Sequence, residues 1–247
     1  MKLLRYRKDG QAGYGILEGE TVYQLIGPPY ADRHERGPAA GSLHSLKILA
    51  PCEPTKIICA AKNYPWGENP SQSPRPLLFF KPPSSVIAHE DNIVYPSQSR
   101  RLIFESELVV VMGKAARNIK IEEASRYILG YTCGNDVTAY DFILRDNATF
   151  HGKSFDTFCP LGPFLATGLD PENTTITCRV NGEVRVNGST ATKYYSCAEL
   201  VSFTSEIMTL FPGDIIMTGT PDIGDIHRGD LVEIDIAGIG LLKNRVV

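Results

Sequence analysis

The stretch Phe104-Glu105-Ser106-Glu107-Leu108-Val109-Val110-Val111-Met112 decides how this chain folds. Its apolar, largely β-branched run predicts a buried strand, and residues i and i+2 of a strand project from the same face. The side chains of Glu105 and Glu107 should therefore lie side by side where the strand begins. Two neighbouring carboxylates at the mouth of an apolar strand repel each other and resist the loss of solvent, so this pair needs an explanation.

A third acid, Asp136, follows in the dipeptide Asn135-Asp136. A divalent cation would remove both penalties, because carboxylate oxygens are hard ligands that suit Mg²⁺, Mn²⁺ or Ca²⁺. The alternative is an exposed strand end with acids in solvent, which is common on protein surfaces. From these residues alone, both interpretations stay open.

Composition describes an ordinary globular protein. The 247 residues are 43% hydrophobic and 21% charged, and the net charge of -3 gives no electrostatic case for nucleic acid or for an anionic membrane. The N-terminus lacks the apolar core of a signal peptide, and no stretch approaches the roughly 18 uninterrupted apolar residues of a membrane helix. We therefore expect a cytoplasmic protein without a nucleic-acid or membrane partner.

The six cysteines are far apart in the sequence. Their spacing excludes the standard zinc patterns and argues against a disulfide framework in a chain of this size. We expect most of them to be small buried side chains. A redox role for Cys133 or Cys159, which flank the expected site, is the alternative.

Short strands separated by Pro and Gly dominate the chain, which predicts a β-rich α+β fold. Residues 1–50 contain two strand-like runs, at 13–20 and 21–26, and then a Gly/Pro-rich connecting loop at 27–42. We expect this part to form a small N-terminal domain, and residues 51–247 to form the catalytic domain. Within the second part, strands are predicted at residues 56–61, 76–80, 104–112, 175–180 and 231–236.

Two helices are predicted. The segment 121–129 begins with acidic residues and is followed by Gly130, as helix dipole and C-cap preferences favour. The segment 196–210 opens with Ser196 and Glu199, a capping box, and Pro212 stops it. Its apolar residues recur at helical spacing and predict a core-facing side made of Leu200, Phe203, Ile207 and Leu210.

From Lys56 to the C-terminus the chain resembles the fumarylacetoacetate hydrolase family. The landmarks follow the family's order: Lys62-Asn63-Tyr64, Phe80-Lys81-Pro82, Glu105-Ser106-Glu107-Leu108, Gly130-Tyr131-Thr132, Asn135-Asp136, Gly152-Lys153-Ser154, Leu161-Gly162-Pro163, Val180-Asn181-Gly182-Glu183, Pro212-Gly213-Asp214 and Thr218-Gly219-Thr220-Pro221. The resemblance implies a mixed β-sandwich roll with a few short helices behind a small N-terminal β domain. It also implies a homodimer.

The resemblance further implies a site. Glu105, Glu107 and Asp136 match the family's ligands for a divalent metal, here Mg²⁺ or else Mn²⁺ or Ca²⁺. Such an ion binds the carboxylate and the keto or enol oxygen of a 2-oxo acid and stabilises the enolate. Lys153 matches the active-site lysine, although an exposed loop lysine is the ordinary alternative. Substrate contacts are expected at Lys81, Tyr140, Arg185, Gly219 and Thr220, with a plain turn as the alternative for the last two.

The departures from the family pattern bear on the reaction. Hydrolases of the family carry a His and a Glu after Asn-Tyr, a pair that activates water. In this chain Gly67 and Pro70 stand at those positions. Tyr140 and Ile143 stand where the family commonly has Arg and Gln. Metal binding is thus preserved, while water activation is not.

Three residues are candidates for a replacement base, and an exposed loop position is the alternative for each. Glu68 lies within the segment that forms the lid in the family. His151 precedes Lys153 by two residues, so an extended conformation would place both side chains on the same side. His89 lies in a polar stretch. Histidine is the natural base near neutral pH.

These observations predict a divalent-metal-dependent enzyme that acts on a 2-oxo or 2-hydroxy-dienoic dicarboxylic acid through a metal-stabilised enolate. Decarboxylation and keto–enol or double-bond isomerisation are favoured, because neither needs activated water. One alternative is a C–C bond hydrolase of the acylpyruvate or fumarylacetoacetate type with an unusual base. The other is a non-catalytic module that binds a metal and a dicarboxylate.

Overall fold

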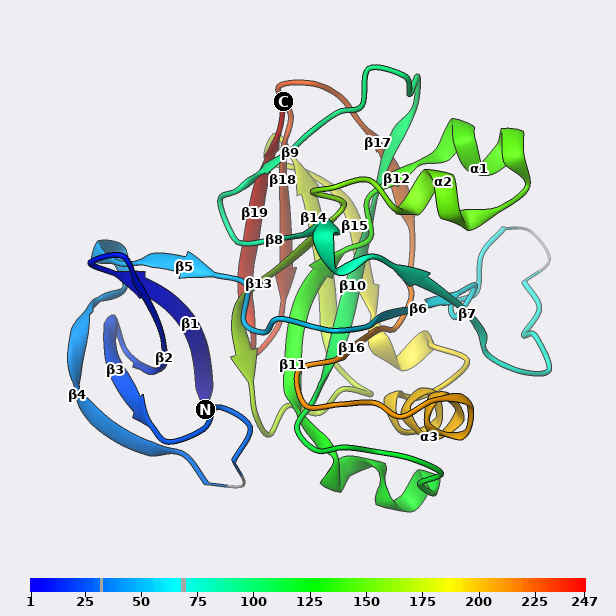
Figure 1. The fold of residues 1–247 in the computed structure, drawn as a ribbon. Coiled ribbons are helices and arrows are strands. Elements are labelled where there is room, and N and C mark those ends of the chain that lie inside the picture. Colours follow the sequence, from blue (N-terminus) through cyan, green and yellow to red (C-terminus); the bar gives the residue numbers. More distant parts are fainter. Residues whose placement is uncertain (32, 68–69) are drawn as a thin grey trace.

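The structure is a computed structural model that describes residues 1–31, 33–67 and 70–247. Two β-sheets with a few short helices make up these residues (Figure 1). The β-rich α+β fold predicted from the sequence is therefore confirmed. The predicted strands of the second part are all present, each within two residues of its expected bounds.

The larger sheet runs in the order β4-β3-β2-β1-β13-β11-β10-β16-β6-β7, with β5, β8, β12 and β17 pairing beside this path. Its strands are β1 (Lys2–Lys8), β2 (Gln11–Glu18), β3 (Thr21–Ile26), β4 (Glu35–Ser42), β5 (Lys47–Leu49), β6 (Ile57–Ala61), β7 (Leu77–Lys81), β8 (Val86–Ile87), β10 (Leu102–Met112), β11 (Ile128–Asn135), β12 (Thr138–Ala139), β13 (Cys159–Ala166), β16 (Ile215–Met217) and β17 (Ile223–Ile226).

The smaller sheet runs in the order β15-β14-β18-β19-β9. Its strands are β9 (Asn92–Ile93), β14 (Thr175–Val180), β15 (Glu183–Ser189), β18 (Leu231–Ile236) and β19 (Gly240–Val246). The α-helices are α1 (Tyr140–Asp146), α2 (Thr149–Lys153) and α3 (Cys197–Ile207), and the 3-10 helices are η1 (Leu43–Ser45), η2 (Pro83–Ser85), η3 (Ile121–Arg126) and η4 (Thr190–Thr192).

Strand β10 is buried on both of its faces, and its side chains contribute to two hydrophobic clusters. Leu108 and Val110 belong to the core that includes the inward residues of the smaller sheet. Val109 and Val111, on the opposite face, pack in a second cluster with residues of β6, β13 and β16. A strand buried on both faces has a continuous apolar sequence, as residues 108–112 do.

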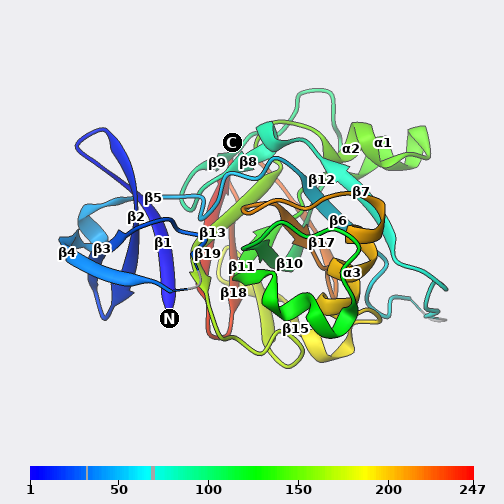
Figure 2. The ribbon, with the colours of Figure 1, turned by 60° about the horizontal axis from the view of Figure 1, so that its bottom comes forward.

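The first four strands form a lobe at one side of the molecule, with β1 nearest to the rest of the chain (Figures 1 and 2). Strand β1 pairs antiparallel with β13 through Lys2 and Leu3, so the lobe continues the larger sheet. Its own small core contains Leu4, Tyr6, Val22, Ala40, Leu46 and Ile48.

Three local predictions were wrong. The expected loop 27–42 ends in strand β4, whose mostly exposed residues give no apolar alternation and which is held by backbone pairing to β3. The expected helix 121–129 is the short η3, and Gly130 lies within β11. Helix α3 has the predicted capping box at Ser196 but ends at Ile207, which is 56% exposed and not a core residue.

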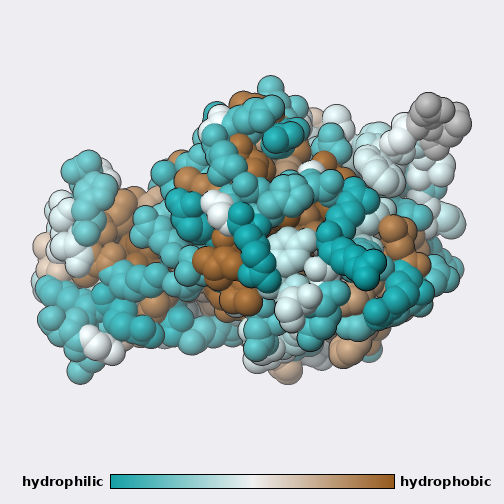
Figure 3. Space-filling model, turned by 90° about the horizontal axis from the view of Figure 1, so that it is seen from above, coloured by the Kyte–Doolittle hydropathy of each residue, from teal (hydrophilic) through white to brown (hydrophobic). Residues whose placement is uncertain are grey.

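All six cysteines are free and buried, as their spacing predicted. Within the described ranges, no helix is long and apolar enough to cross a membrane. The face shown in Figure 3 is mainly hydrophilic, with separate hydrophobic patches between the polar side chains.

Candidate metal centre and active-site pocket

Antiparallel pairing of β10 with β11 brings the three predicted acids together. Ser106 lies opposite Asn135 in the register, so Asp136 comes to lie beside Glu105. The backbone N–H of Asp136 donates to the backbone oxygen of Glu105 at 3.0 Å. One carboxylate oxygen from each of Glu105, Glu107 and Asp136 lies within 4.8 Å of the others. Glu107 and Asp136 are buried, and Glu105 is half-buried.

Two buried lysines reach this cluster from different elements. Lys153, at the end of α2, donates to Glu105 Oε1 at 2.7 Å and to Asp136 Oδ2 at 2.6 Å. Lys81, at the end of β7, donates to Asp136 Oδ1 at 2.6 Å and to the backbone oxygen of Val137 at 3.1 Å. Three carboxylates and two ammonium groups leave one negative charge uncompensated.

Glu107 is the carboxylate without a lysine partner among the described residues. Its side chain accepts a hydrogen bond from the Gly219 N–H at 2.6 Å, and no lysine of the described chain forms an ion pair with it. Burial, followed by repulsion from Asp136 and Glu105, raises its pKa well above the ordinary value. Burial also raises the pKa of Glu105, against the attraction of Lys153.

Asp136 and Lys153 behave in the opposite way. Burial disfavours the charge of Asp136, but attraction from Lys153 and Lys81 outweighs it and lowers the pKa of this carboxyl group. Burial likewise disfavours the charge of Lys153, and Asp136 and Glu105 outweigh it and raise the pKa of the amine. Both groups are therefore held in their charged forms.

The acid cluster fits a divalent cation. Three convergent carboxylates are the donor set of a hard ion, and the uncompensated Glu107 is the position at which added positive charge would relieve the largest electrostatic cost. The hydroxyl of Thr138 donates to Glu105 Oε1 at 2.8 Å, which fixes the orientation of that carboxylate from a neighbouring side chain.

Helix α2 sets the position of Lys153 through close packing at Gly152. A Cβ atom at Gly152 would lie 2.7 Å from the backbone oxygen of Ala139 and from the side chain of Ile143. Glycine thus lets α2 approach β12 and α1 closely enough for the Lys153 amine to reach the acids. The ring of Phe79 lies 5.1 Å from this amine.

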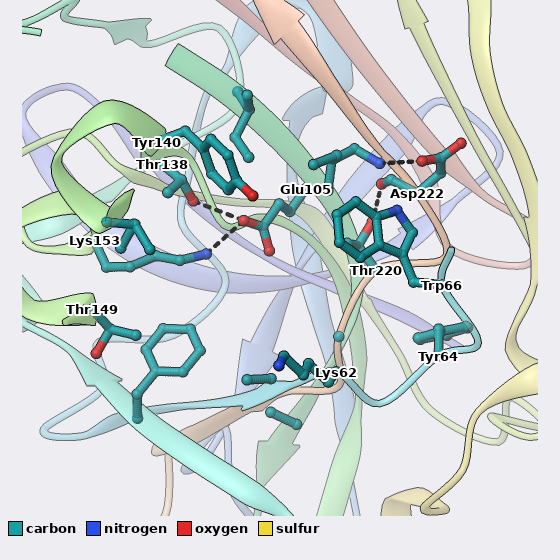
Figure 4. Close-up of a pocket in the computed structure, with 17 residues that line it drawn as sticks. Lys62, Tyr64, Trp66, Glu105, Thr138, Tyr140, Thr149, Lys153, Thr220 and Asp222 are labelled. Carbon is teal, nitrogen blue, oxygen red and sulfur yellow. Dashed lines mark hydrogen bonds and ion pairs between the residues drawn. The ribbon is translucent and has the colours of Figure 1, made fainter. Parts of the chain in front are cut away.

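A cavity of about 260 Å³ opens beside Glu105 and Lys153 (Figure 4). Its walls are largely apolar and aromatic, and Figure 4 shows the Tyr140 hydroxyl directed towards Glu105. The lining residues are Ala60, Ala61, Lys62, Tyr64, Trp66, Phe79, Ile103, Glu105, Thr138, Tyr140, Ile143, Thr149, Lys153, Gly219, Thr220, Asp222 and Ile223. Among these described residues, Glu105 and Asp222 are the carboxylates and none is a histidine.

The turn that was expected to hold a substrate carboxylate does line the cavity, through Gly219 and Thr220. The Gly219 N–H is committed to Glu107, with φ +92° at this residue. The Thr220 hydroxyl donates to the backbone oxygen of Asp222 at 2.6 Å. The turn therefore connects the buried acid to the cavity wall.

The structure places His151 away from the cavity. An extended conformation would have placed His151 on the same side as Lys153, but residues 149–153 form helix α2, where positions two apart diverge. The His151 ring stacks on Phe142 at 4.1 Å, and its Nδ1 atom lies 2.9 Å from Asp146 Oδ2. Lys153 points to the acids instead.

The other predicted site residues have separate surroundings. Lys81 lies behind Asp136, with a fully buried side chain that does not line the cavity. Arg185 is on β15 and pairs with Glu183 at 3.1 Å, outside the cavity lining. His89 accepts a hydrogen bond from the Lys243 N–H at 3.2 Å. Glu68 lies outside the described residues.

Sequence reasoning missed seven polar or aromatic residues of the site. The cavity is also lined by Lys62, Tyr64, Trp66, Phe79, Thr138, Thr149 and Asp222. Lys62 and Tyr64 belong to the landmark Lys62-Asn63-Tyr64, and Trp66 follows it by two residues, so this landmark was the available signal. Nothing in the sequence distinguished Thr138 or Asp222, because their contacts arise from strand pairing and from the turn after β16.

The sequence profile described as fumarylacetoacetate (FAA) hydrolase, C-terminal, matches residues 56–247. This range contains the acid cluster, both buried lysines and every residue of the cavity. The chain belongs to the fumarylacetoacetate hydrolase family. A second profile, described as Rv2993c-like, N-terminal, matches residues 1–51.

Relatives of this chain within the family include named isomerases and tautomerases. Protein MJ1656 of Methanocaldococcus jannaschii is 48% identical over 198 residues, which cover 78% of this chain and 84% of that protein. The human mitochondrial protein named oxaloacetate tautomerase FAHD2A is 38% identical over 262 residues, covering 99% and 79%. The crystal structure of 2-hydroxyhepta-2,4-diene-1,7-dioate isomerase from Mycobacterium marinum has a TM-score of 0.93 and 34% identity, covering 100% and 98%.

Proposed function

We propose that this protein is a divalent-metal-dependent isomerase or tautomerase of a 2-oxo or 2-hydroxy-dienoic dicarboxylic acid. The observation that carries the proposal is the buried cluster of three acids, which joins Lys153 at the wall of an apolar cavity. The human relative is named an oxaloacetate tautomerase, and the mycobacterial structure is named a 2-hydroxyhepta-2,4-diene-1,7-dioate isomerase. Both names refer to substrates of this class and support the choice of reaction.

Glu105, Glu107 and Asp136 would hold the cation. When bound, a cation of this kind supplies a fixed positive charge that favours the enolate form of a 2-oxo acid. Lys81 keeps Asp136 ionised and oriented from the buried side, and Thr138 orients Glu105. These contacts are available before any substrate arrives, so the site is preorganised for charge that develops in the reaction.

Lys153 and the cavity walls would act on the substrate itself. The Lys153 amine is held in its charged form beside Glu105 and places positive charge where the oxygen of the enolate develops. Tyr140 offers a hydroxyl directed towards the same acid. The apolar walls, including Phe79 and Ile103, exclude water and strengthen both interactions.

Gly67 and Pro70 stand where the family's hydrolases carry the His and Glu that activate water, and this favours proton transfer over C–C hydrolysis. A tautomerisation moves one proton between the carbon next to the keto group and the keto oxygen, and it consumes no water. Hydrolysis needs a base within hydrogen-bond reach of a water, a contribution of about 10²–10⁴ in rate. His151 does not line the cavity, and Gly67 and Pro70 have no basic side chain.

The test compares substrates at one Mg²⁺ concentration. We expect kcat/KM on oxaloacetate (keto–enol exchange) and on a 2-hydroxy-diene-dioate (double-bond shift) to exceed that on an acylpyruvate (cleavage). An acylpyruvate preference of tenfold or more, about 1.4 kcal/mol, would establish the hydrolase alternative. Release of CO₂ would identify decarboxylation, which proceeds through the same enolate. Tight ligand binding without any turnover would identify a non-catalytic module.

A further inference from the structure

Lys62 is the cation of the cavity to which the reaction assigns no role. It directly follows strand β6 and lines the cavity together with Ala61 and Trp66. Figure 4 shows its side chain on the opposite side of Glu105 from Tyr140 and Thr138, and separate from the Lys153 amine. Lys62 therefore faces a part of the cavity away from the contacts made by Lys153.

The backbone at Lys62 is held in a conformation that costs energy. Its φ of +53° lies in the left-handed region, where a residue with a Cβ atom typically costs about 1 kcal/mol or more and where glycine is favoured. The next residue fixes this conformation. The Asn63 side chain donates to the backbone oxygens of Tyr195 and Thr218 at 3.0 and 2.8 Å, and it accepts from the Tyr195 N–H at 2.8 Å. These hydrogen bonds fix the backbone at Lys62 and therefore the direction in which its side chain leaves the chain.

Among the described residues, Lys62 has no partner of opposite charge, in contrast to the other lysines near the site. Lys153 and Lys81 are both bound to carboxylates. Among the described residues, none forms an ion pair or a side-chain hydrogen bond with Lys62, which is exposed at the cavity. Phe79 and Trp66 also line the cavity, so an anion bound beside Lys62 would meet this cation and aromatic side chains.

We infer that Lys62 is a specificity-determining residue that binds the carboxylate at the far end of the substrate. The inference rests on the proposed function, which places the reacting 2-oxo acid end at Glu105 and Lys153. A dicarboxylate has a second anionic end, and Lys62 is the remaining cation among the described residues of the cavity. An ammonium–carboxylate hydrogen bond at this position selects diacids over monoacids of the same length.

The experiment compares two substrates that differ at the far carboxylate. Oxaloacetate and its 4-methyl ester share the same reacting 2-oxo acid end, and the ester carries a methyl group in place of the anionic charge that Lys62 would bind. We measure kcat and KM for both with wild type, Lys62→Met and Lys62→Glu. The ratio of kcat/KM for diacid over ester should fall about two- to fivefold in Lys62→Met, through KM of the diacid, and further in Lys62→Glu because like charges repel.

Two further variants make the result decisive. Lys120→Met removes an exposed lysine that does not line the cavity, and its ratio should equal that of wild type. Lys62→Gly relieves the backbone strain, so it should fold at least as stably as wild type while still losing the preference for the diacid. An unchanged ratio in Lys62→Met and Lys62→Gly, with both substrates turned over, would overturn the role of Lys62 and leave the proposed function intact. Failure of wild type on every 2-oxo acid would instead contradict the proposed function.

Discussion

Replacing Glu107 by glutamine should make the metal-free protein more stable and should reduce the stability that the protein gains on adding Mg²⁺. Glutamine keeps the shape of the side chain and an oxygen that accepts from the Gly219 N–H, while it removes the buried charge. The neighbouring carboxylate oxygens lie within 4.8 Å. Two unit charges about 4 Å apart repel by about 4 kcal/mol at an effective dielectric constant of about 20. Lys153 offsets part of this repulsion.

We therefore expect Glu107→Gln to raise the free energy of unfolding by about 1–3 kcal/mol without metal, or Tm by several degrees. Mg²⁺ at about 1,000 times its Kd should stabilise wild type by about 4.1 kcal/mol and the variant by much less. The order of the two stabilities should then reverse. The exposed Glu122→Gln serves as the control, with neither effect.

The pH dependence gives the same prediction an independent check. The pKa of Glu107 is raised above 4.5 in the folded protein, so the folded state binds this proton more tightly than the unfolded chain does. Wild type consequently loses stability as pH rises from about 4.5 through the raised pKa, and Glu107→Gln loses less, because only the raised pKa of Glu105 still contributes. The gain from the substitution should be small near pH 4 and complete at higher pH. If the variant is less stable than wild type at every pH, Glu107 carries no unfavourable buried charge. If Mg²⁺ stabilises the variant as much as wild type, Glu107 does not bind the ion.

The remaining predictions concern the lysine, its helix and the assembly. Lys153→Met should lower kcat/KM by at least about 10²-fold and destabilise the metal-free protein by about 3–5 kcal/mol, because it leaves buried acids unpaired; denaturant unfolding and steady-state kinetics measure both, and full activity would exclude a catalytic role. Gly152→Ala should lower the free energy of unfolding by about 1–3 kcal/mol and reduce kcat, because a Cβ atom 2.7 Å from the Ala139 backbone oxygen displaces α2. A variant with the stability and activity of wild type would show that the packing adapts. The family suggests a homodimer, so sedimentation at micromolar concentration should give twice 27.2 kDa, and a species of 27.2 kDa would contradict this.

The part of the site that lies within one strand was predictable from the sequence. The i, i+2 geometry of Glu105 and Glu107 follows from the strand pattern alone, and the capping box at Ser196 likewise marked the start of α3. Local rules set these features. Strand β4 was missed because pairing with β3, rather than its own residues, makes it a strand.

The contacts that complete the site depend on tertiary structure. Lys153 belongs to a helix rather than to an extended segment, so the expected alignment with His151 failed. The sequence offered Lys81 as a substrate contact, whereas pairing of β6 with β7 carries its amine behind Asp136. The role of Lys62 depends on a positive φ and on a cavity, and neither can be read from a lysine beside an Asn-Tyr motif.

Exchange of the proton on the carbon next to the keto group tests the central claim most directly. Oxaloacetate is followed in D₂O by nuclear magnetic resonance, with and without Mg²⁺, at times when the uncatalysed exchange is small. We expect Mg²⁺-dependent deuterium incorporation at this carbon in wild type, and loss of it in Glu107→Gln and Lys153→Met. Incorporation no faster than the uncatalysed rate, from an enzyme that cleaves an acylpyruvate under the same conditions, would contradict it.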